Sequence, residues 1–130
     1  MFKLTLIEDD EVIVYLTKKI IKESGNSELL NVLSNGKRAL EYFEENVKNE
    51  ELLPDIIFLD ISMPVIDGWQ FLDEFQVIKN KITKPISIYI TTSSISHSDI
   101  EREKKCNLIS DFIIKPITLE NFNNIIDSCN

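Results

Sequence analysis

Short, continuous apolar runs alternate along this chain with longer segments whose apolar residues recur at helical spacing. Runs of this kind are typical of strands buried on both faces of a parallel sheet, and the recurring positions are typical of amphipathic helices. The pattern predicts five strands, at residues 3–7, 29–33, 56–59, 86–91 and 112–114. Strands that alternate with helices predict a doubly wound parallel sheet with helices on both faces and right-handed crossovers.

Most of the predicted helices carry a clear apolar stripe. The stripes are Ile13, Leu16 and Ile20; Leu40, Phe43 and Val47; Phe71, Leu72, Phe75 and Ile78; and Leu119, Phe122 and Ile126. One predicted helix, residues 99–105, has almost no apolar stripe, and either Ser96 or Ser98 is expected to cap it. Its position in the fold is therefore the least determined by the hydrophobic pattern.

Length and charge narrow the class of protein. The chain has 130 residues and a net charge of −8, which indicates one domain over residues 1–130. The acidic balance disfavours nucleic acid and anionic membranes as partners, because both would need a basic face. The sequence offers neither a signal peptide nor an apolar run of ~18 residues, so a cytoplasmic location is expected. Cys106 and Cys129 match no metal spacing and are expected to be free thiols.

Polar residues stand at the predicted carboxyl ends of four strands. Glu8 and Asp9 follow the first strand, Asp60 the third, Thr92 the fourth and Lys115 the fifth. In a flavodoxin-like (βα)5 fold with strand order 2-1-3-4-5, the first and third strands are neighbours and ligands bind where the order reverses. The three carboxylates are therefore expected to converge at one edge of the sheet.

Three carboxylates in one place require a proton or a cation. Two of them ~4 Å apart repel by ~4 kcal/mol at an effective dielectric constant of about 20. Mg²⁺ suits such a cluster because it takes a few carboxylate oxygens together with water and phosphate oxygens, and Mn²⁺ is an alternative. A phosphoryl group delivered to Asp60 would meet this metal, the Lys115 ammonium and the Thr92 hydroxyl. The set favours phosphoryl transfer to a carboxylate nucleophile, with an aspartyl phosphate as product.

Four sequence pieces, in this order, resemble the receiver domain of two-component response regulators. They are Leu6-Ile7-Glu8-Asp9-Asp10, Phe58-Leu59-Asp60-Ile61-Ser62-Met63-Pro64-Val65-Ile66-Asp67-Gly68, Ile90-Thr91-Thr92-Ser93-Ser94 and Phe112-Ile113-Ile114-Lys115-Pro116. The resemblance covers essentially the whole chain, and the combination is far more specific than any single piece.

The resemblance implies a metal-assisted phosphoacceptor. Asp60 would accept the phosphoryl group, Asp9 would bind Mg²⁺ directly and Glu8 would bind it through water. The backbone carbonyl of Ser62 would be a further metal ligand. The chain would then be a phosphoacceptor switch that assists its own phosphoryl transfer and autodephosphorylation, rather than an enzyme acting on other substrates.

The remaining matching residues would contact or tune the phosphoryl group. Thr92 and Lys115 would contact it directly, and the Lys115-Pro116 bond would be the family's cis peptide, a form that is accessible mainly at X-Pro bonds. Ser62 and Ser94 stand at the two variable positions that the family ties to the dephosphorylation rate.

Output is expected to leave through a surface of the domain. Phe112, where many family members have a switch tyrosine, lies three residues before Lys115, so its ring is expected to face away from the site. Movement of Thr92 toward the phosphoryl group would make room for this ring and reshape the face formed by helix 99–105, strand 112–114 and the last helix. A histidine kinase or phosphotransfer protein would supply the phosphoryl group, and a downstream protein would bind this face.

Other classes use similar residues. Phosphohydrolases of the haloacid-dehalogenase type also combine Asp, Thr, Lys and Mg²⁺, but they resemble one another in a second aspartate two residues after the nucleophile, where this chain has Ser62. A flavodoxin would need hydroxyls and backbone donors after the first strand, where Glu8-Asp9-Asp10 stands. A receiver that no longer accepts phosphate is disfavoured by the complete set of site residues.

Overall fold

A single parallel sheet organises the chain. The computed structural model describes residues 1–129, so only Asn130 of the predicted domain 1–130 lies outside the described residues. The sheet has the order β2-β1-β3-β4-β5, with every neighbouring pair parallel. Its strands are β1 (Phe2–Ile7), β2 (Ser27–Leu33), β3 (Ile56–Asp60), β4 (Ser87–Thr92) and β5 (Ile109–Ile114). The predicted flavodoxin-like fold with order 2-1-3-4-5 is confirmed.

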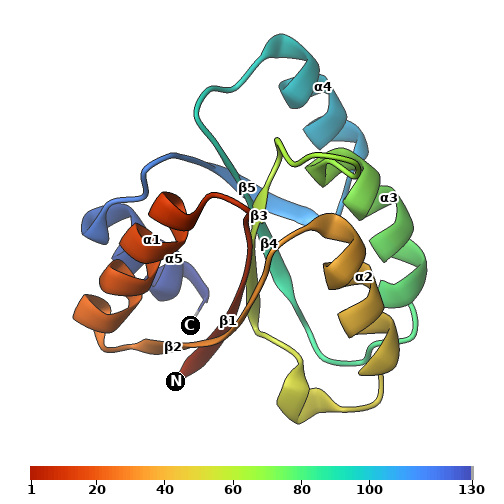
Figure 1. Ribbon diagram of the computed structural model, residues 1–130, viewed down its shortest axis with the longest axis horizontal. Coiled ribbons are helices and arrows are strands. Elements are labelled where there is room, and N and C mark those ends of the chain that lie inside the picture. Colours follow the sequence, from red (N-terminus) through yellow and green to blue (C-terminus); the bar gives the residue numbers. More distant parts are fainter. Residues whose placement is uncertain (130) are drawn as a thin grey trace.

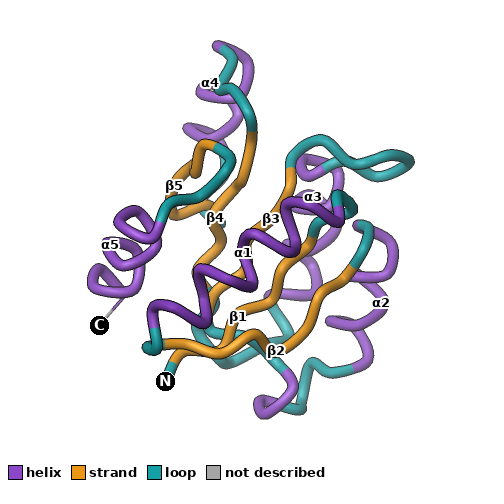
Figure 2. Tube along the Cα trace, turned by 60° about the vertical axis from the view of Figure 1, so that its left-hand side comes forward, coloured by secondary structure: helices purple, strands orange, loops and turns teal. Residues whose placement is uncertain are grey.

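Helices cover both faces of the sheet. The helix α1 (Glu11–Ser24) lies with α5 (Leu119–Cys129) on one face, and α2 (Gly36–Glu45) lies with α3 (Gly68–Lys79) on the other (Figure 1). The helix α4 (His97–Lys105) stands apart from the others in both views (Figure 1, Figure 2), and a short 3-10 helix, η1 (Glu50–Leu52), precedes β3. Among the described residues, no helix has the length and apolar character needed to cross a membrane.

The sheet separates two aromatic cores. On the α2 and α3 side, the rings of Phe43, Phe71 and Phe75 lie with their centres 5.1 to 6.4 Å apart. On the α1 and α5 side, Phe58 meets the rings of Tyr89 and Phe122 edge-on. All five residues of β3 are buried, as its continuous apolar run predicts. Burial on both faces makes β3 a rigid support for the residue at its end.

Several element boundaries differ from those predicted. The helix α2 ends at Glu45 rather than reaching Val47, because Asn46 donates its side-chain amide to Tyr42 O (2.8 Å) and closes the last turn. The strands β2 and β5 begin two and three residues earlier than predicted, by pairing with β1 and β4. Leu119, predicted to face inward, is 37% exposed because it opens α5 above the core. Ser96, one of the two predicted caps, is the N-cap of α4.

The loop between β3 and α3 contains a strained residue, Val65. Its φ is 70°, and Ile66 N donates to Pro64 O (2.9 Å) across it, which is the pattern of a γ-turn with a left-handed central residue. A β-branched side chain in this region is unfavourable. Val65 is also 92% exposed, so packing does not compensate for the strain.

Val65→Gly is expected to raise the free energy of unfolding by about 1 kcal/mol, because glycine adopts positive φ without steric cost. Urea unfolding followed by far-UV circular dichroism measures the change. Val77→Gly is the matched control, since Val77 is also exposed but lies inside α3. That variant should lose roughly 0.3–0.5 kcal/mol, the difference in helix propensity between valine and glycine. A Val65→Gly midpoint at or below that of the parent would contradict the assigned strain.

Candidate functional site

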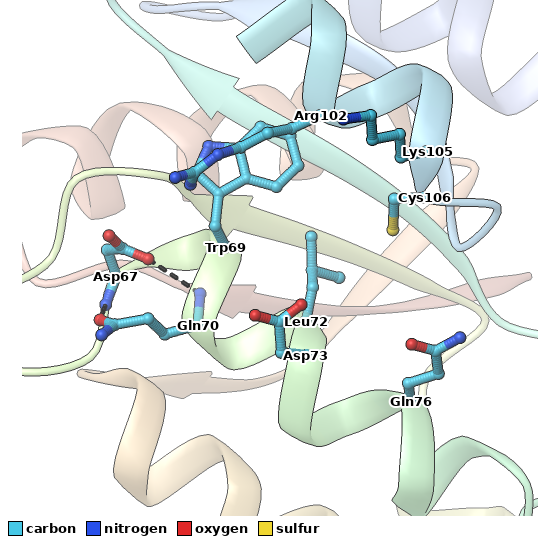
Figure 3. Close-up of a pocket in the computed structure, with 9 residues that line it drawn as sticks. All are labelled: Asp67, Trp69, Gln70, Leu72, Asp73, Gln76, Arg102, Lys105 and Cys106. Carbon is cyan, nitrogen blue, oxygen red and sulfur yellow. Dashed lines mark hydrogen bonds between the residues drawn. The ribbon is translucent and has the colours of Figure 1, made fainter. Parts of the chain in front are cut away.

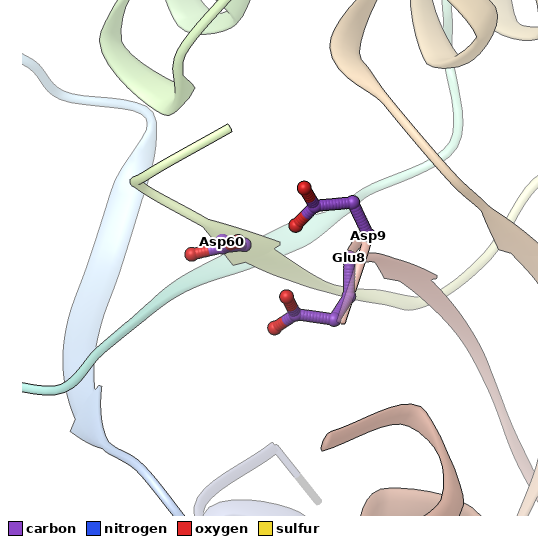
Figure 4. Close-up of side chains that lie close together, drawn as sticks. All are labelled: Glu8, Asp9 and Asp60. Carbon is purple, nitrogen blue, oxygen red and sulfur yellow. The ribbon is translucent and has the colours of Figure 1, made fainter. Parts of the chain in front are cut away.

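Acidic side chains from two neighbouring strands meet at the carboxyl edge of the sheet. The strands β1 and β3 pair with Ile7 opposite Leu59, so the residues that follow lie side by side. Glu8 and Asp9 follow β1, and Asp60 ends β3. One carboxylate oxygen from each residue lies within 4.8 Å of the other two, and Figure 4 shows the three side chains around one shared space.

The backbone around Asp60 is tightly held. Ile61 N donates to Thr91 O (3.2 Å), which extends the sheet pairing one residue beyond β3. Gly68 N donates to Ile61 O (3.0 Å), and a Cβ on Gly68 would lie 2.8 Å from Ile61 Cα and 3.0 Å from Asp60 O. Glycine at position 68 is therefore required for α3 to begin this close to Asp60. The Asp60 side chain itself is only 4% exposed.

Lys115 supplies the positive charge of the site. Its Nζ lies 2.9 Å from Asp60 Oδ1, to which it donates a hydrogen bond, and 2.8 Å from Glu8 Oε1. Glu8 Oε1 has no partner that meets the geometry of a hydrogen bond, so the second contact is described as an ion pair. Lys115 N donates to Thr92 O (2.8 Å), which fixes the start of the loop after β5. The Lys115-Pro116 peptide bond is cis.

The site shifts the pKa values of two of its members. Burial of Glu8, with help from the nearby Asp60 carboxylate, raises the pKa of Glu8 from 4.5 to about 7, although Lys115 acts in the opposite direction. Burial lowers the pKa of Lys115, but Glu8 and Asp60 together outweigh burial and raise it above its ordinary value. The ammonium is thus charged throughout the neutral range, whereas Glu8 changes charge within it.

The raised pKa of Glu8 predicts a pH dependence of the metal-free protein. Between pH 4.5 and about 7 the folded state holds a proton that the unfolded chain has released, so the free energy of unfolding falls as pH rises through this window. The part that belongs to Glu8 is on the order of 1–3 kcal/mol. Urea unfolding in EDTA at a series of pH values should show this slope in the parent protein.

Glu8→Gln should flatten the slope in that window, because glutamine neither takes up nor releases the proton. Glu23→Gln is the control, since Glu23 is an exposed residue of α1. It should leave the slope unchanged. Parallel stability curves for the parent and Glu8→Gln would mean that Glu8 titrates at its ordinary pH.

The side chains of Thr92, Ser62 and Ser94 lie around the acidic cluster but do not point into it. The Thr92 hydroxyl is buried and donates to Ser94 O (2.7 Å), within its own loop, rather than to Asp60. Ser62 N donates to Asp60 Oδ1 (3.1 Å), while the Ser62 and Ser94 side chains are exposed. The structure therefore brings Glu8, Asp9, Asp60 and Lys115 together and leaves the Thr92 hydroxyl engaged elsewhere.

Phe112 lies on the α3 face of the sheet. It is half-buried and meets the ring of Trp69 edge-on, with the ring centres 6.4 Å apart. Trp69 itself contacts α4, because its Nε1 donates to Asp99 Oδ1 (3.3 Å). Its contact with α4 has no sequence signal beyond an aromatic residue that follows Gly68.

The donor atoms of the cluster fit a hard divalent cation. They are all oxygens, they come from residues held by β1 and β3, and the Glu8 oxygen nearest Lys115 is buried without a directed hydrogen bond. Mg²⁺ prefers a small number of carboxylate oxygens in a partly open site, because it keeps some of its water. Asp9 is exposed, which leaves one side of the cluster accessible to solvent.

Comparison with known proteins points to one family. A family model described as the response regulator receiver domain matches residues 4–127. The probable methanogenesis regulatory protein FilR2 of Methanothrix harundinacea (strain 6Ac) is 25% identical over 126 residues, 97% of this chain and 79% of that protein. The hybrid signal transduction histidine kinase I of Dictyostelium discoideum is 27% identical over 115 residues, 88% of this chain but 6% of that protein. The chain thus spans most of one relative and a small part of the other.

A solved structure agrees with these sequence matches. The crystal structure of a two component response regulator from Cytophaga hutchinsonii superposes with a TM-score of 0.82 at 26% identity. The similarity covers 98% of this chain and 95% of that one, so the two folds agree over nearly their whole length.

Proposed function

Because this chain belongs to the response regulator receiver domain family, we propose that residues 1–130 form one receiver, in the cytoplasm, whose phosphoacceptor is Asp60. A receiver domain is a signalling switch of two-component systems rather than a classical enzyme. The observation that carries the assignment of Asp60 is its position: it is buried at the end of β3, 2.9 Å from the Lys115 ammonium and beside Glu8 and Asp9.

The proposed step is transfer of a phosphoryl group from a phosphohistidine to the Asp60 carboxylate. A carboxylate oxygen forms the new bond to phosphorus, the bond between phosphorus and the histidine nitrogen breaks, and that nitrogen keeps the electron pair. Asp60 Oδ1 accepts hydrogen bonds from Lys115 Nζ and Ser62 N. We therefore assign the attack to Oδ2, whose lone pairs are not held by those two donors.

Receiver domains bind Mg²⁺ in an acidic pocket, and Glu8, Asp9 and Asp60 supply such a pocket here. We assign Asp9 and Asp60 as direct ligands, Glu8 as a ligand through water and the Ser62 backbone carbonyl as a further ligand. Bound Mg²⁺ would neutralise charge on the transferred phosphoryl oxygens. Lys115 would contact the same oxygens, because its Nζ already lies between Glu8 and Asp60.

We assign the conformational change to Thr92 and Phe112. The Thr92 hydroxyl must leave Ser94 O to reach a phosphoryl group on Asp60, so the loop after β4 would move with it. Phe112 pairs with Ile90, two residues before Thr92 in β4, and would then repack on the α3 side. Ser62 and Ser94 flank the acceptor with exposed side chains and would tune how fast water removes the phosphoryl group.

We propose that a histidine kinase or phosphotransfer protein supplies the phosphoryl group. A downstream protein would bind the face formed by α4, β5 and α5, because this face contains the elements next to Thr92 and Phe112. A partner that prefers the phosphorylated shape shifts the equilibrium by its differential affinity for the two states.

The proposal is tested with acetyl phosphate, a small phosphodonor. Incubation of the protein with acetyl phosphate and Mg²⁺, followed by intact-mass spectrometry, should show the gain of one phosphoryl group that mild base removes. Omission of Mg²⁺ with EDTA present should prevent the gain. An unchanged mass under all conditions, with the fold intact by circular dichroism, would refute the proposed acceptor function.

A further inference from the structure

The helix α4 lacks the buried apolar face that normally holds a helix in place. All nine of its residues are exposed or half-buried. Figures 1 and 2 both show it standing apart from the helices that cover the sheet. An amphipathic surface helix usually docks through an apolar stripe, so a helix without one depends on individual polar and aromatic contacts.

Two such contacts converge on the indole of Trp69. Its Nε1 donates to Asp99 Oδ1 (3.3 Å) in the first turn of α4. The guanidinium carbon of Arg102, one turn further on, lies 5.5 Å from the centre of the ring, within the range of a cation–π contact. Figure 3 shows the Arg102 side chain over the indole. Trp69 therefore contacts α4 at two successive turns.

Trp69 is also close to the acidic site through the backbone. It directly follows Gly68, whose N donates to Ile61 O (3.0 Å) and where a Cβ would lie 2.8 Å from Ile61 Cα. A movement of the loop after Asp60 must therefore move the first turn of α3 and the Trp69 backbone. The same indole touches Phe112 of β5 edge-on, so it joins three elements.

The indole has room to move. A cavity of about 450 Å³ lies between α3 and α4, with Trp69 and Leu72 on one side and Lys105 and Cys106 on the other. Displacement of the ring into this space breaks its contacts with α4 without a clash in the buried core. Trp69 thus contacts α4 directly and also has space into which its ring can move away from α4.

We propose that Trp69 is a latch that fastens α4 to the start of α3, and that movement of the backbone after Asp60 reaches α4 through this latch in addition to the Thr92 loop. The second part of this proposal, in which a change at Asp60 triggers movement of α4, rests on the proposed function of Asp60. The attachment of α4 does not, so the two are tested separately.

The attachment is tested in the unphosphorylated protein by amide hydrogen exchange over residues 97–105. Arg102→Gln and Trp69→Phe should each speed exchange about three- to tenfold, the effect of losing roughly one weak net contact. Lys104→Gln is the matched control, since it also removes one positive charge from α4. Lys104 does not lie over the indole; its Nζ lies 3.9 Å from Glu101 Oε1. Equal exchange in Arg102→Gln, Trp69→Phe and the control would overturn the latch.

The trigger is tested with beryllofluoride and Mg²⁺, a stable mimic of the phosphorylated state. Trp69 is the only tryptophan of the chain, so its emission and its quenching by acrylamide report on the indole directly. In the parent protein the mimic should increase quenching and speed exchange in α4. Arg102→Gln should show a smaller exchange response to the mimic than the parent, because α4 has already lost its contact with the face of the indole in this variant.

The outcomes separate the trigger from the proposed function. An exchange response in Arg102→Gln as large as that in the parent would overturn the second route and leave coupling to the Thr92 loop alone. A parent protein that gains phosphate from acetyl phosphate but shows no change at Trp69 would also overturn it. A parent that gains no phosphate refutes the acceptor function and the trigger together, while the exchange result in the free protein still decides the attachment.

Discussion

Asp60→Asn is expected to take up no phosphoryl group from acetyl phosphate, where the parent protein takes up one. An amide has the same size as the carboxylate, so the end of β3 should keep its shape. Its oxygen is a far weaker nucleophile, and its nitrogen cannot form an acyl phosphate. Intact-mass spectrometry measures the occupancy, and circular dichroism with a urea unfolding curve establishes that the variant is folded.

Asp67→Asn is the matched control for this loss. Asp67 lies in the same loop after β3 and caps α3 through Gln70 N (2.9 Å), a role that asparagine performs equally well. This variant should gain one phosphoryl group as the parent does. Incorporation in Asp60→Asn comparable with that in Asp67→Asn would place the acceptor elsewhere and remove the basis for the proposed function.

The strand order could be predicted because the sheet is parallel and buried. A strand covered on both faces, such as β3, must be a continuous apolar run, and a crossover helix must separate it from the next parallel strand. The order 2-1-3-4-5 follows from the alternation of strands with helices and from the resemblance to receiver domains. In that order the ends of β1 and β3 must be adjacent. The meeting of Glu8, Asp9 and Asp60 is then a consequence of topology, which needs no knowledge of their side-chain conformations.

Features that depend on side-chain direction or on exposed elements could not be predicted in the same way. The Thr92 hydroxyl can turn toward Asp60 or toward its own loop at little cost, so its bond to Ser94 O has no sequence signal. The helix α4 has no apolar stripe, so the hydrophobic pattern carries no information about its neighbours. Its contacts with Trp69 appear only when the start of α3 and the end of β4 are placed in three dimensions.

Lys84 makes contacts that the hydrophobic pattern of the sequence did not predict. It lies in the connection before β4, where its Nζ donates to Leu53 O (2.7 Å) and lies 3.3 Å from Asp55 Oδ1. It thereby ties two connections at the amino edge of the sheet, opposite the acidic site. A lysine between Thr83 and Pro85 has the local appearance of a solvated loop residue, so only the folded structure reveals its role.

Lys115→Met is expected to lower the free energy of unfolding of the metal-free protein by about 2–4 kcal/mol at pH 7.5. The ammonium lies within 3 Å of two buried carboxylates, and methionine leaves Glu8 and Asp60 facing each other without it. This loss of stability should be smaller below pH 7, because Glu8 then takes up a proton and the repulsion between Glu8 and Asp60 falls. Urea unfolding in EDTA at pH 6 and pH 7.5 measures both effects.

Mg²⁺ should restore more stability to Lys115→Met than it adds to the parent, because a divalent cation then supplies the charge that the ammonium gave. Lys84→Met is the matched control: the Lys84 and Lys115 side chains are 16% and 15% exposed, and each is paired with an aspartate. It should lose about 1–3 kcal/mol through its unpaired partners, and Mg²⁺ should stabilise it no more than it stabilises the parent. Equal Mg²⁺ responses in the two lysine variants would contradict the expected replacement of the Lys115 charge by the metal, since only Lys115 lies beside Glu8 and Asp60.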